Sequence, residues 1–396
     1  MPDVALPFSR EEYAQRLAKT RAAMEAAGIE LLIAVDPSNM AWLTGYDGWS
    51  FYVHQAVLLG LEGEPIWWGR MQDANGARRT VFMAEENIVG YPDHYVQSTE
   101  RHPMDHLAAL IRDHGWGGKR VGLELENYYF SAAAYLALQK GLPDARFVDA
   151  TALVNRQRGV KSPQEIAYMR RAARIVEKMH DRILSVVKPG KRKNEIAAEI
   201  FHAGILGAEE NGAAFGGDYP AIVPMLPTGP FSAAPHITWS DRRFQPGATI
   251  VEIAGCRRRY HCPLARTVYL GTPSERERDT EKAVIEGVAE ALGAVKAGAL
   301  AEDVEAAWRK SVSRWGIVKE SRLGYSIGIN YPPDWGEHST SLRPGDKTEL
   351  QPNMTFHLMP GLWFDDWGIE ISQPFRVTET GHEALTSYPR ELIVKA

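Results

Sequence analysis

Residues 247 to 271, GATIVEIAGCRRRYHCPLARTVYLG, constrain the fold most, because they predict two adjacent β-strands joined by a polar turn at the arginines 257 to 259. The first strand carries a single acid, Glu252, between β-branched residues. Burying an unpaired carboxylate is costly, so we expect Glu252 to face a pocket that holds a partner for it. His236, one loop upstream, is the first candidate for that partner.

The rest of the chain divides into two parts, and 396 residues suffice for two hydrophobic cores. In residues 1–155, helix patterns alternate with strand patterns, which predicts an α/β domain with a sheet covered by helices. Residues 156–396 begin with Ser162-Pro163-Gln164-Glu165, an N-cap signature that predicts a long helix. Further helices are predicted at 193–206 and 275–298, followed by strand-like segments, so the second domain is α+β.

Composition excludes several classes of partner. The formal net charge is -5, so no basic field exists to bind nucleic acid or an anionic membrane. The two cysteines do not form a disulfide framework, and a reducing compartment fits them. The N-terminus lacks the pattern of a signal peptide, and no apolar run reaches the length of a membrane span. We therefore expect a cytoplasmic protein.

Five separated segments, in order, resemble the creatinase, prolidase and methionine aminopeptidase family. They are RGVKSPQEIAYMRRAA, AIVPMLPTGPFSAAPH, LGYSIGINYPP, MTFHLMPG and GIEISQPFRVTETG, together with the hairpin. The resemblance implies a pita-bread catalytic domain over residues 156–396 and a creatinase-like N-terminal domain over residues 1–155.

Metal-dependent members of that family hold two ions with two aspartates, one histidine and two glutamates. The first aspartate falls on Glu252 or on Ile253, depending on the direction of counting. The other four positions hold side chains that cannot replace such ligands: Pro263, Tyr325, Met359 and Ser372. We therefore expect no catalytic metal and no other cofactor. The histidine that serves as acid/base in the family corresponds to His236.

A site without metal suits a substrate that brings its own positive charge, because an amidinium carbon is already electrophilic. The stretches GYSIGINYPPDWGEHSTSLRPGD and DGWSFYVHQ resemble the metal-free ectoine hydrolase branch of the family. That branch consists of homodimers that open the cyclic amidine of ectoine or 5-hydroxyectoine, zwitterionic small molecules, to N-acetyl-2,4-diaminobutyrate. The resemblance implies a covalent intermediate on a glutamate. It predicts Glu252 as the nucleophile and His236 as the acid/base.

Other side chains are candidates for binding the substrate. An aromatic loop of the N-terminal domain suggests lid residues, although packing at a dimer interface is an equal alternative for that loop. A phenol stands at a former ligand position, and the Pro-rich loop and the last strands add further rings. The substrate-binding candidates are Trp49, Tyr52, Tyr325, Trp335, Trp363 and His357. Glu337 is expected to be a solvated loop acid, and a structural ion pair is an open alternative for Glu370.

Two other functions stay open at this level. One is a creatinase-like enzyme that cleaves another guanidinium or amidinium substrate without metal. The other is a catalytically inactive relative that binds peptides. Retention of His236 and of an inward-facing acid in a strand disfavours the binding module, which would need neither.

Overall fold

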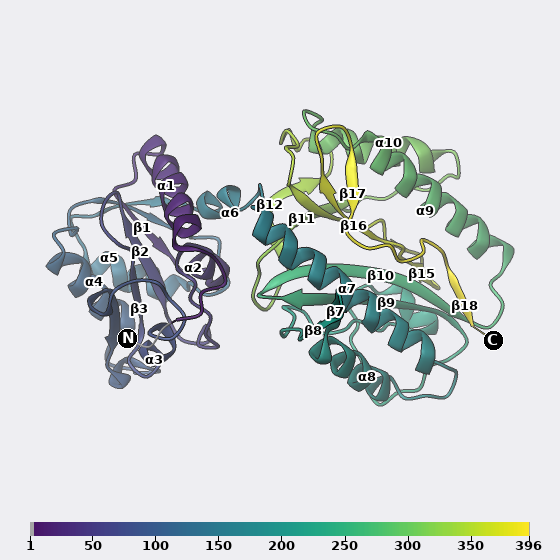
Figure 1. Cartoon of the computed structure of the whole chain (residues 1–396), viewed down its shortest axis with the longest axis horizontal. Coiled ribbons are helices and arrows are strands. Elements are labelled where there is room, and N and C mark those ends of the chain that lie inside the picture. The colour runs from purple at the N-terminus through teal and green to yellow at the C-terminus, as the bar shows by residue number, and fades with distance from the viewer. Residues whose placement is uncertain (1–3, 396) are drawn as a thin grey trace. The chain divides into compact units, whose positions relative to one another are not determined.

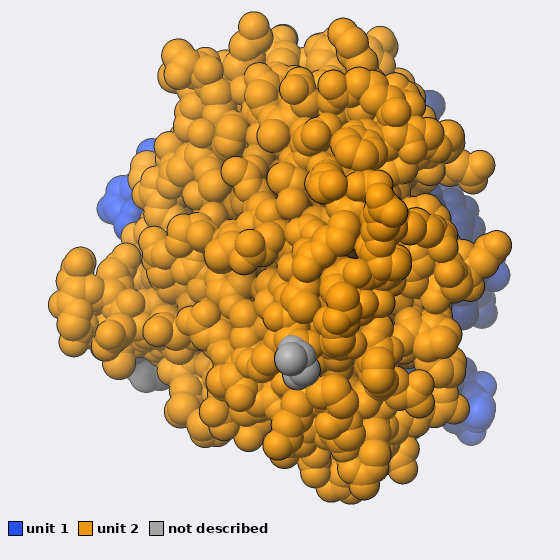
Figure 2. All heavy atoms as spheres, turned by 90° about the vertical axis from the view of Figure 1, so that its right-hand side faces the viewer, with its two compact units in different colours: residues 1–158 blue, residues 159–396 orange. Residues whose placement is uncertain are grey.

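The computed structural model describes residues 4–395, and the chain divides into two compact units, 1–158 and 159–396 (Figure 2). The division lies close to the boundary expected after residue 155. Within the described residues, no helix combines the length and the apolar character needed to cross a membrane.

The first unit is built on one six-stranded mixed sheet with the strand order β4-β3-β2-β1-β5-β6 (Figure 1). Strands β1 and β5 are parallel, whereas β2 and β3 form an antiparallel hairpin. The strands are β1 (Leu31–Ala34), β2 (Ala56–Gly60), β3 (Ile66–Arg70), β4 (Ile88–Tyr91), β5 (Arg120–Leu123) and β6 (Arg146–Asp149). The helices are α1 (Arg10–Ala26), α2 (Pro37–Thr44), α3 (Ala74–Ala77), α4 (Pro103–Asp113), α5 (Ala132–Gly141) and α6 (Leu153–Gln157), with short 3-10 turns η1 (Glu85–Asn87) and η2 (Asp93–Tyr95).

The second unit contains a three-stranded sheet, β18-β10-β9, and a five-stranded sheet, β12-β11-β13-β16-β17. Its helices are α7 (Pro163–Val186), α8 (Lys193–Leu206), α9 (Glu275–Ala294) and α10 (Ala301–Ser313), with the 3-10 turn η3 (Gly229–Ala233). Its strands are β7 (Ala208–Glu210), β8 (Ala213–Phe215), β9 (Gly247–Arg257), β10 (Tyr260–Leu270), β11 (Gly324–Ile327), β12 (Gly336–Leu342), β13 (Thr355–Leu358), β14 (Leu362–Trp363), β15 (Gly368–Ile369), β16 (Gln373–Val377), β17 (His382–Ala384) and β18 (Ile393–Lys395).

The predicted hairpin supplies two of the three strands of the smaller sheet. Strands β9 and β10 pair in one continuous antiparallel register, and α7 packs across both (Figure 1). The turn consists of Arg258 and Arg259, with φ of 51° and 67°, the left-handed pair that suits a two-residue hairpin. At Gly255 the helix comes so close that an added Cβ would lie 2.0 Å from the carbonyl oxygen of Ala172. Glycine there lets α7 cover one face of the ladder, which leaves the opposite face for the site.

Two sequence expectations in the second unit need correction. Glu337 is not a solvated loop acid: it lies buried on β12 and pairs with the buried Lys161 at 2.6 Å. The sequence around Glu337 does not reveal this ion pair, because its partner lies far away in the sequence. Helix α10 is also absent from the sequence expectations, although its apolar face packs on α9 in the core of this unit.

Candidate active site

Glu252 lies in the middle of β9, opposite Ala265 of β10, and only 5 % of it is exposed. On its other side, the main chain of Glu252 exchanges two hydrogen bonds with Met225, at 3.0 and 3.2 Å between nitrogen and oxygen. Burial raises the pKa of the Glu252 carboxyl well above its usual range, and the negative charges of Glu370 and Asp334 raise it further. The expectation of an inward-facing acid therefore agrees with the structure.

The β9–β10 register decides which residue takes the position of the family's first aspartate. Side chains directly opposite each other in an antiparallel ladder share a face, and so do residues two apart along a strand. Glu252 pairs with Ala265, so it shares its face with Pro263, the position of the second aspartate. Ile253 points to the other face, toward α7. The first position is therefore Glu252.

A hydrogen-bonded chain of buried side chains occupies two more of those positions. The Trp335 indole N–H donates to the Tyr325 hydroxyl at 2.6 Å, and that hydroxyl lies 3.2 Å from Nδ1 of His357. His357 Nε2 lies 2.7 Å from the Ser372 hydroxyl, which accepts the Ala265 backbone N–H at 2.8 Å. Burial, then the charges of Arg266 and Arg322, lower the pKa of His357 to about 3, so its ring is neutral.

These residues do not fit a pair of divalent ions. The hydroxyls of Tyr325 and Ser372 are already bound within the chain of hydrogen bonds, and Pro263 and Met359 offer no oxygen or imidazole donor. Among the described residues, no three His, Cys, Asp or Glu side chains are grouped so that they could hold a metal. What remains is a buried carboxyl, Glu252, near the charges of Glu370 and Asp334 and close to a neutral chain of hydrogen bonds.

A second buried acid, Glu370, lies close enough for its charge to act on Glu252, and 1 % of it is exposed. Its backbone N–H donates to the Thr267 hydroxyl at 2.8 Å, and that hydroxyl donates to the Glu370 carbonyl at 3.1 Å. Its carboxylate makes no ion pair with any described residue, so the alternative of a structural ion pair is wrong. Burial raises its pKa to about 7, against the opposing charges of Lys319 and Arg266. In the sequence IEIS, Glu370 precedes Ser372 by two residues, and this spacing was the available signal that the two side chains lie on the same side of an extended segment.

The predicted role of His236 as the partner of Glu252 has the least support from the geometry. It lies exposed in the turn that follows η3, next to the segment in which Thr238 bridges to Met225. Met225 thus lies between this segment and Glu252, because it forms β-bridges to both Thr238 and Glu252. Within residues 4–395, no hydrogen bond or ion pair joins His236 to Glu252. The charges that raise the pKa of the Glu252 carboxyl are those of Glu370 and Asp334, and a role for His236 beside Glu252 stays a prediction.

The remaining candidates fall into two groups. Trp335, Tyr325 and His357 are buried together in the second unit, and Trp363 lies half-buried with the Lys319 ammonium 5.0 Å from its ring centroid. In the first unit, Trp49 and Tyr52 are 58 % and 65 % exposed. Exposed aromatic side chains of this size are available to cover a substrate or a second subunit, and their role stays a prediction.

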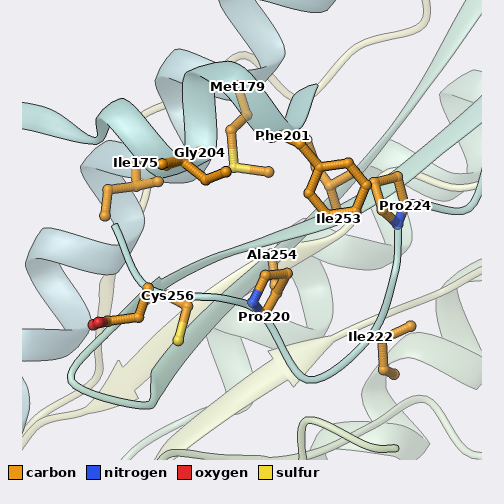
Figure 3. Close-up of a pocket in the computed structure, with 12 residues that line it drawn as sticks. Ile175, Met179, Phe201, Gly204, Pro220, Ile222, Pro224, Ile253, Ala254 and Cys256 are labelled. Carbon is orange, nitrogen blue, oxygen red and sulfur yellow. The ribbon is translucent and has the colours of Figure 1, made fainter. Parts of the chain in front are cut away.

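An apolar pocket also lies on the second unit, between α7, α8 and β9 (Figure 3). The space available to a water is about 20 Å³, close to the size of a single molecule. None of the candidate site residues named above lines it. Its lining side chains come from Ile175, Met179, Phe201, Ile205, Asp218, Pro220, Ile222, Pro224, Ile253, Ala254 and Cys256. Apart from the Asp218 carboxylate and the Cys256 thiol, its lining is apolar.

Comparisons with known proteins agree with this architecture. Residues 167–379 match the model of metallopeptidase family M24, and residues 16–160 match the creatinase/prolidase N-terminal domain. The chain is 55 % identical to the protein named Ectoine hydrolase of Halomonas elongata over 100 % of both chains. It is 45 % identical to an uncharacterized hydrolase/peptidase of Sinorhizobium fredii over 98 % and 99 % of the two chains.

Solved structures show the same fold. The dipeptidase PepE of Mycobacterium ulcerans superposes with a TM-score of 0.79 at 24 % identity, covering 98 % of this chain and 99 % of that one. A recombinant prolidase of Thermococcus sibiricus gives 0.82 at 24 % identity, covering 97 % and 99 %. The expected combination of a creatinase-like domain and a pita-bread domain is confirmed.

Proposed function

Because the chain belongs to metallopeptidase family M24 and carries its creatinase/prolidase N-terminal domain, we propose that it is a hydrolase that opens the cyclic amidine of ectoine and of 5-hydroxyectoine without a metal. The product is N-acetyl-2,4-diaminobutyrate. The identity of 55 % to Ectoine hydrolase over the whole chain carries this proposal. The two buried acids Glu252 and Glu370 support it, because neighbouring carboxylates suit a cationic amidinium group.

The electrostatics explain why a metal is not needed for this substrate. A divalent ion assists hydrolysis by polarising a neutral carbonyl and by ionising water. The carbon of an amidinium already carries positive charge, and a cation bound between carboxylates stabilises their ionised form. Their unfavourable burial without substrate, seen in the raised pKa of Glu252, is relieved when the cation enters.

In the proposed first step, a Glu252 carboxylate oxygen bonds to the carbon between the two ring nitrogens, and the C=N π electrons move onto nitrogen. One C–N bond then breaks as His236 protonates the departing nitrogen, and the remaining nitrogen forms a C=N bond. In the second step, water adds to that carbon and gives its proton to the acid/base. The bond to Glu252 breaks, the second proton of the water moves to the free amine, and an amide remains.

The homodimer expected from the resemblance stays part of this proposal, with Trp49 and Tyr52 as lid residues. Their exposure supports such a role, since both rings are available to cover a small zwitterion.

A substrate panel tests the proposed function. We expect the purified protein to release N-acetyl-2,4-diaminobutyrate from ectoine, measured by chromatography. We expect it to leave creatine and Xaa-Pro dipeptides intact, because the 55 % identity over the whole chain is to Ectoine hydrolase. Turnover of creatine without turnover of ectoine would assign the chain to the creatinase-like alternative. Inertness toward all three, with tight binding of a peptide, would support the binding module.

A further inference from the structure

Glu370 is attached to β10 close to the position of Glu252. Thr267 lies two residues from Ala265 on β10, and Ala265 is the direct cross-strand partner of Glu252. Both hydrogen bonds between the Thr267 hydroxyl and the Glu370 main chain therefore attach Glu370 to the face of the ladder that carries Glu252. This attachment fixes the distance between two acids that are far apart in the sequence.

One carboxyl oxygen of Glu370, Oε1, is buried and unsatisfied in the part of the chain that the structure describes. Its Oε1 makes no hydrogen bond to any residue from 4 to 395. The nearby cations are committed elsewhere: Lys319 donates to Ser321 and to the Gly361 carbonyl, both at 2.8 Å. Arg266 donates to the carbonyl oxygens of Ala265, Ser372, Tyr388 and Pro389. Buried polar groups are normally hydrogen-bonded, so the unsatisfied Oε1 at this position is able to accept a hydrogen bond from the N–H group of a bound molecule.

The shape of a cyclic amidinium explains why one carboxylate is not enough. Its two ring N–H groups diverge on either side of the carbon between them, and the substituent on that carbon separates them. A single carboxylate cannot span both. Moreover, a nucleophile must approach that carbon from above the ring plane, so Glu252 cannot attack while it binds both N–H groups within the plane. At least one further acceptor is needed.

Resting on the proposed function, we propose that Glu370 is a substrate-binding residue whose Oε1 accepts a ring N–H of the cyclic amidinium, while Glu252 addresses the carbon from the ring face. Two anions on one face of the β9–β10 ladder then flank a single cation. The charged groups around Glu370 suit it to binding a cation, because Lys319 and Arg266 oppose the rise in its pKa that burial causes. Glu252 and Tyr325 are the other titratable groups on which its charge acts.

The role can be tested with Glu370→Gln, which keeps the shape of the side chain and removes its charge. In the proposed complex, Glu370 already pairs with the cation before the reaction, and the attacked carbon loses its positive charge afterwards. Glu370 therefore contributes to binding more than to the chemical step. We therefore expect KM for ectoine to rise about 30-fold or more, while kcat falls much less. The rise in unfolding temperature that ectoine causes in wild type should disappear.

Controls separate this role from a structural one. Without substrate, Glu370→Gln should unfold at the same temperature as wild type or higher, since no described partner loses a bond to Oε1. Glu305→Gln, which alters a buried acid of α10 that pairs with Arg309, should leave KM unchanged. Wild type that turns over ectoine while Glu370→Gln retains its KM would overturn the assignment of Glu370 alone. Wild type that does not act on ectoine would overturn the proposed function.

Discussion

Replacing Glu252 with glutamine is expected to lower the rate of ectoine ring opening by about 10⁴-fold or more. The amide cannot act as the nucleophile, and β9 carries no second carboxylate that could replace it. The measurement is kcat from release of the acetylated product. Glu305→Gln serves again as the control and should keep wild-type kcat. Near-native turnover by Glu252→Gln would remove Glu252 from the mechanism.

Stability measurements on the same variant guard against a trivial loss of folding. A carboxyl whose pKa is raised in the folded state binds its proton more tightly there than in the unfolded chain. Its contribution to stability is therefore full below the unfolded pKa and is lost as pH rises through the folded pKa. Glu252→Gln should unfold at the same temperature as wild type in acid and at a higher temperature at neutral and alkaline pH. Lower stability at neutral pH would contradict this account of the burial of Glu252.

His236→Ala has the second largest expected effect, a fall in kcat of about 10²- to 10³-fold, because proton transfer by a positioned side chain contributes on this scale. The fold should be unaffected, since His236 is exposed and makes no hydrogen bond to Glu252 within the described chain. The measurement is the pH profile of kcat together with its absolute value. His236→Gln keeps a polar side chain of similar length and should not restore the rate.

An unchanged kcat in His236→Ala would transfer the acid/base role to another residue. Glu370 would then be the first alternative, because burial raises its pKa to about 7. In that case Glu370→Gln would lower kcat as strongly as it raises KM, an outcome distinct from the one expected above.

Local signals predicted much of the second unit. Ser162, Pro163 and Glu165 form the capping box that starts α7, as the sequence pattern indicates. The bounds of α8 are those predicted, Lys193–Leu206. The β-branched residues that flank Glu252 also predicted an inward-facing acid, because they indicate a buried strand from its own residues.

Features that depend on distant partners could not be predicted. The hydrogen bonds from Trp335 through Tyr325 and His357 to Ser372 join three separate segments of the chain, and no local period reveals them. The burial of Glu337 depends on Lys161, and the position of Glu370 depends on Thr267. Strand β18, which pairs in parallel with β10, was missed for the same reason.

Metal dependence is the central question, because the proposed mechanism assigns to the substrate the positive charge that metal-dependent relatives obtain from ions. The most direct measurement is the metal content of the purified, active protein, together with ectoine turnover before and after treatment with a chelator. We predict far less than one ion per chain and an unchanged rate. A stoichiometric divalent ion whose removal abolishes turnover, and whose return restores it, would contradict the account.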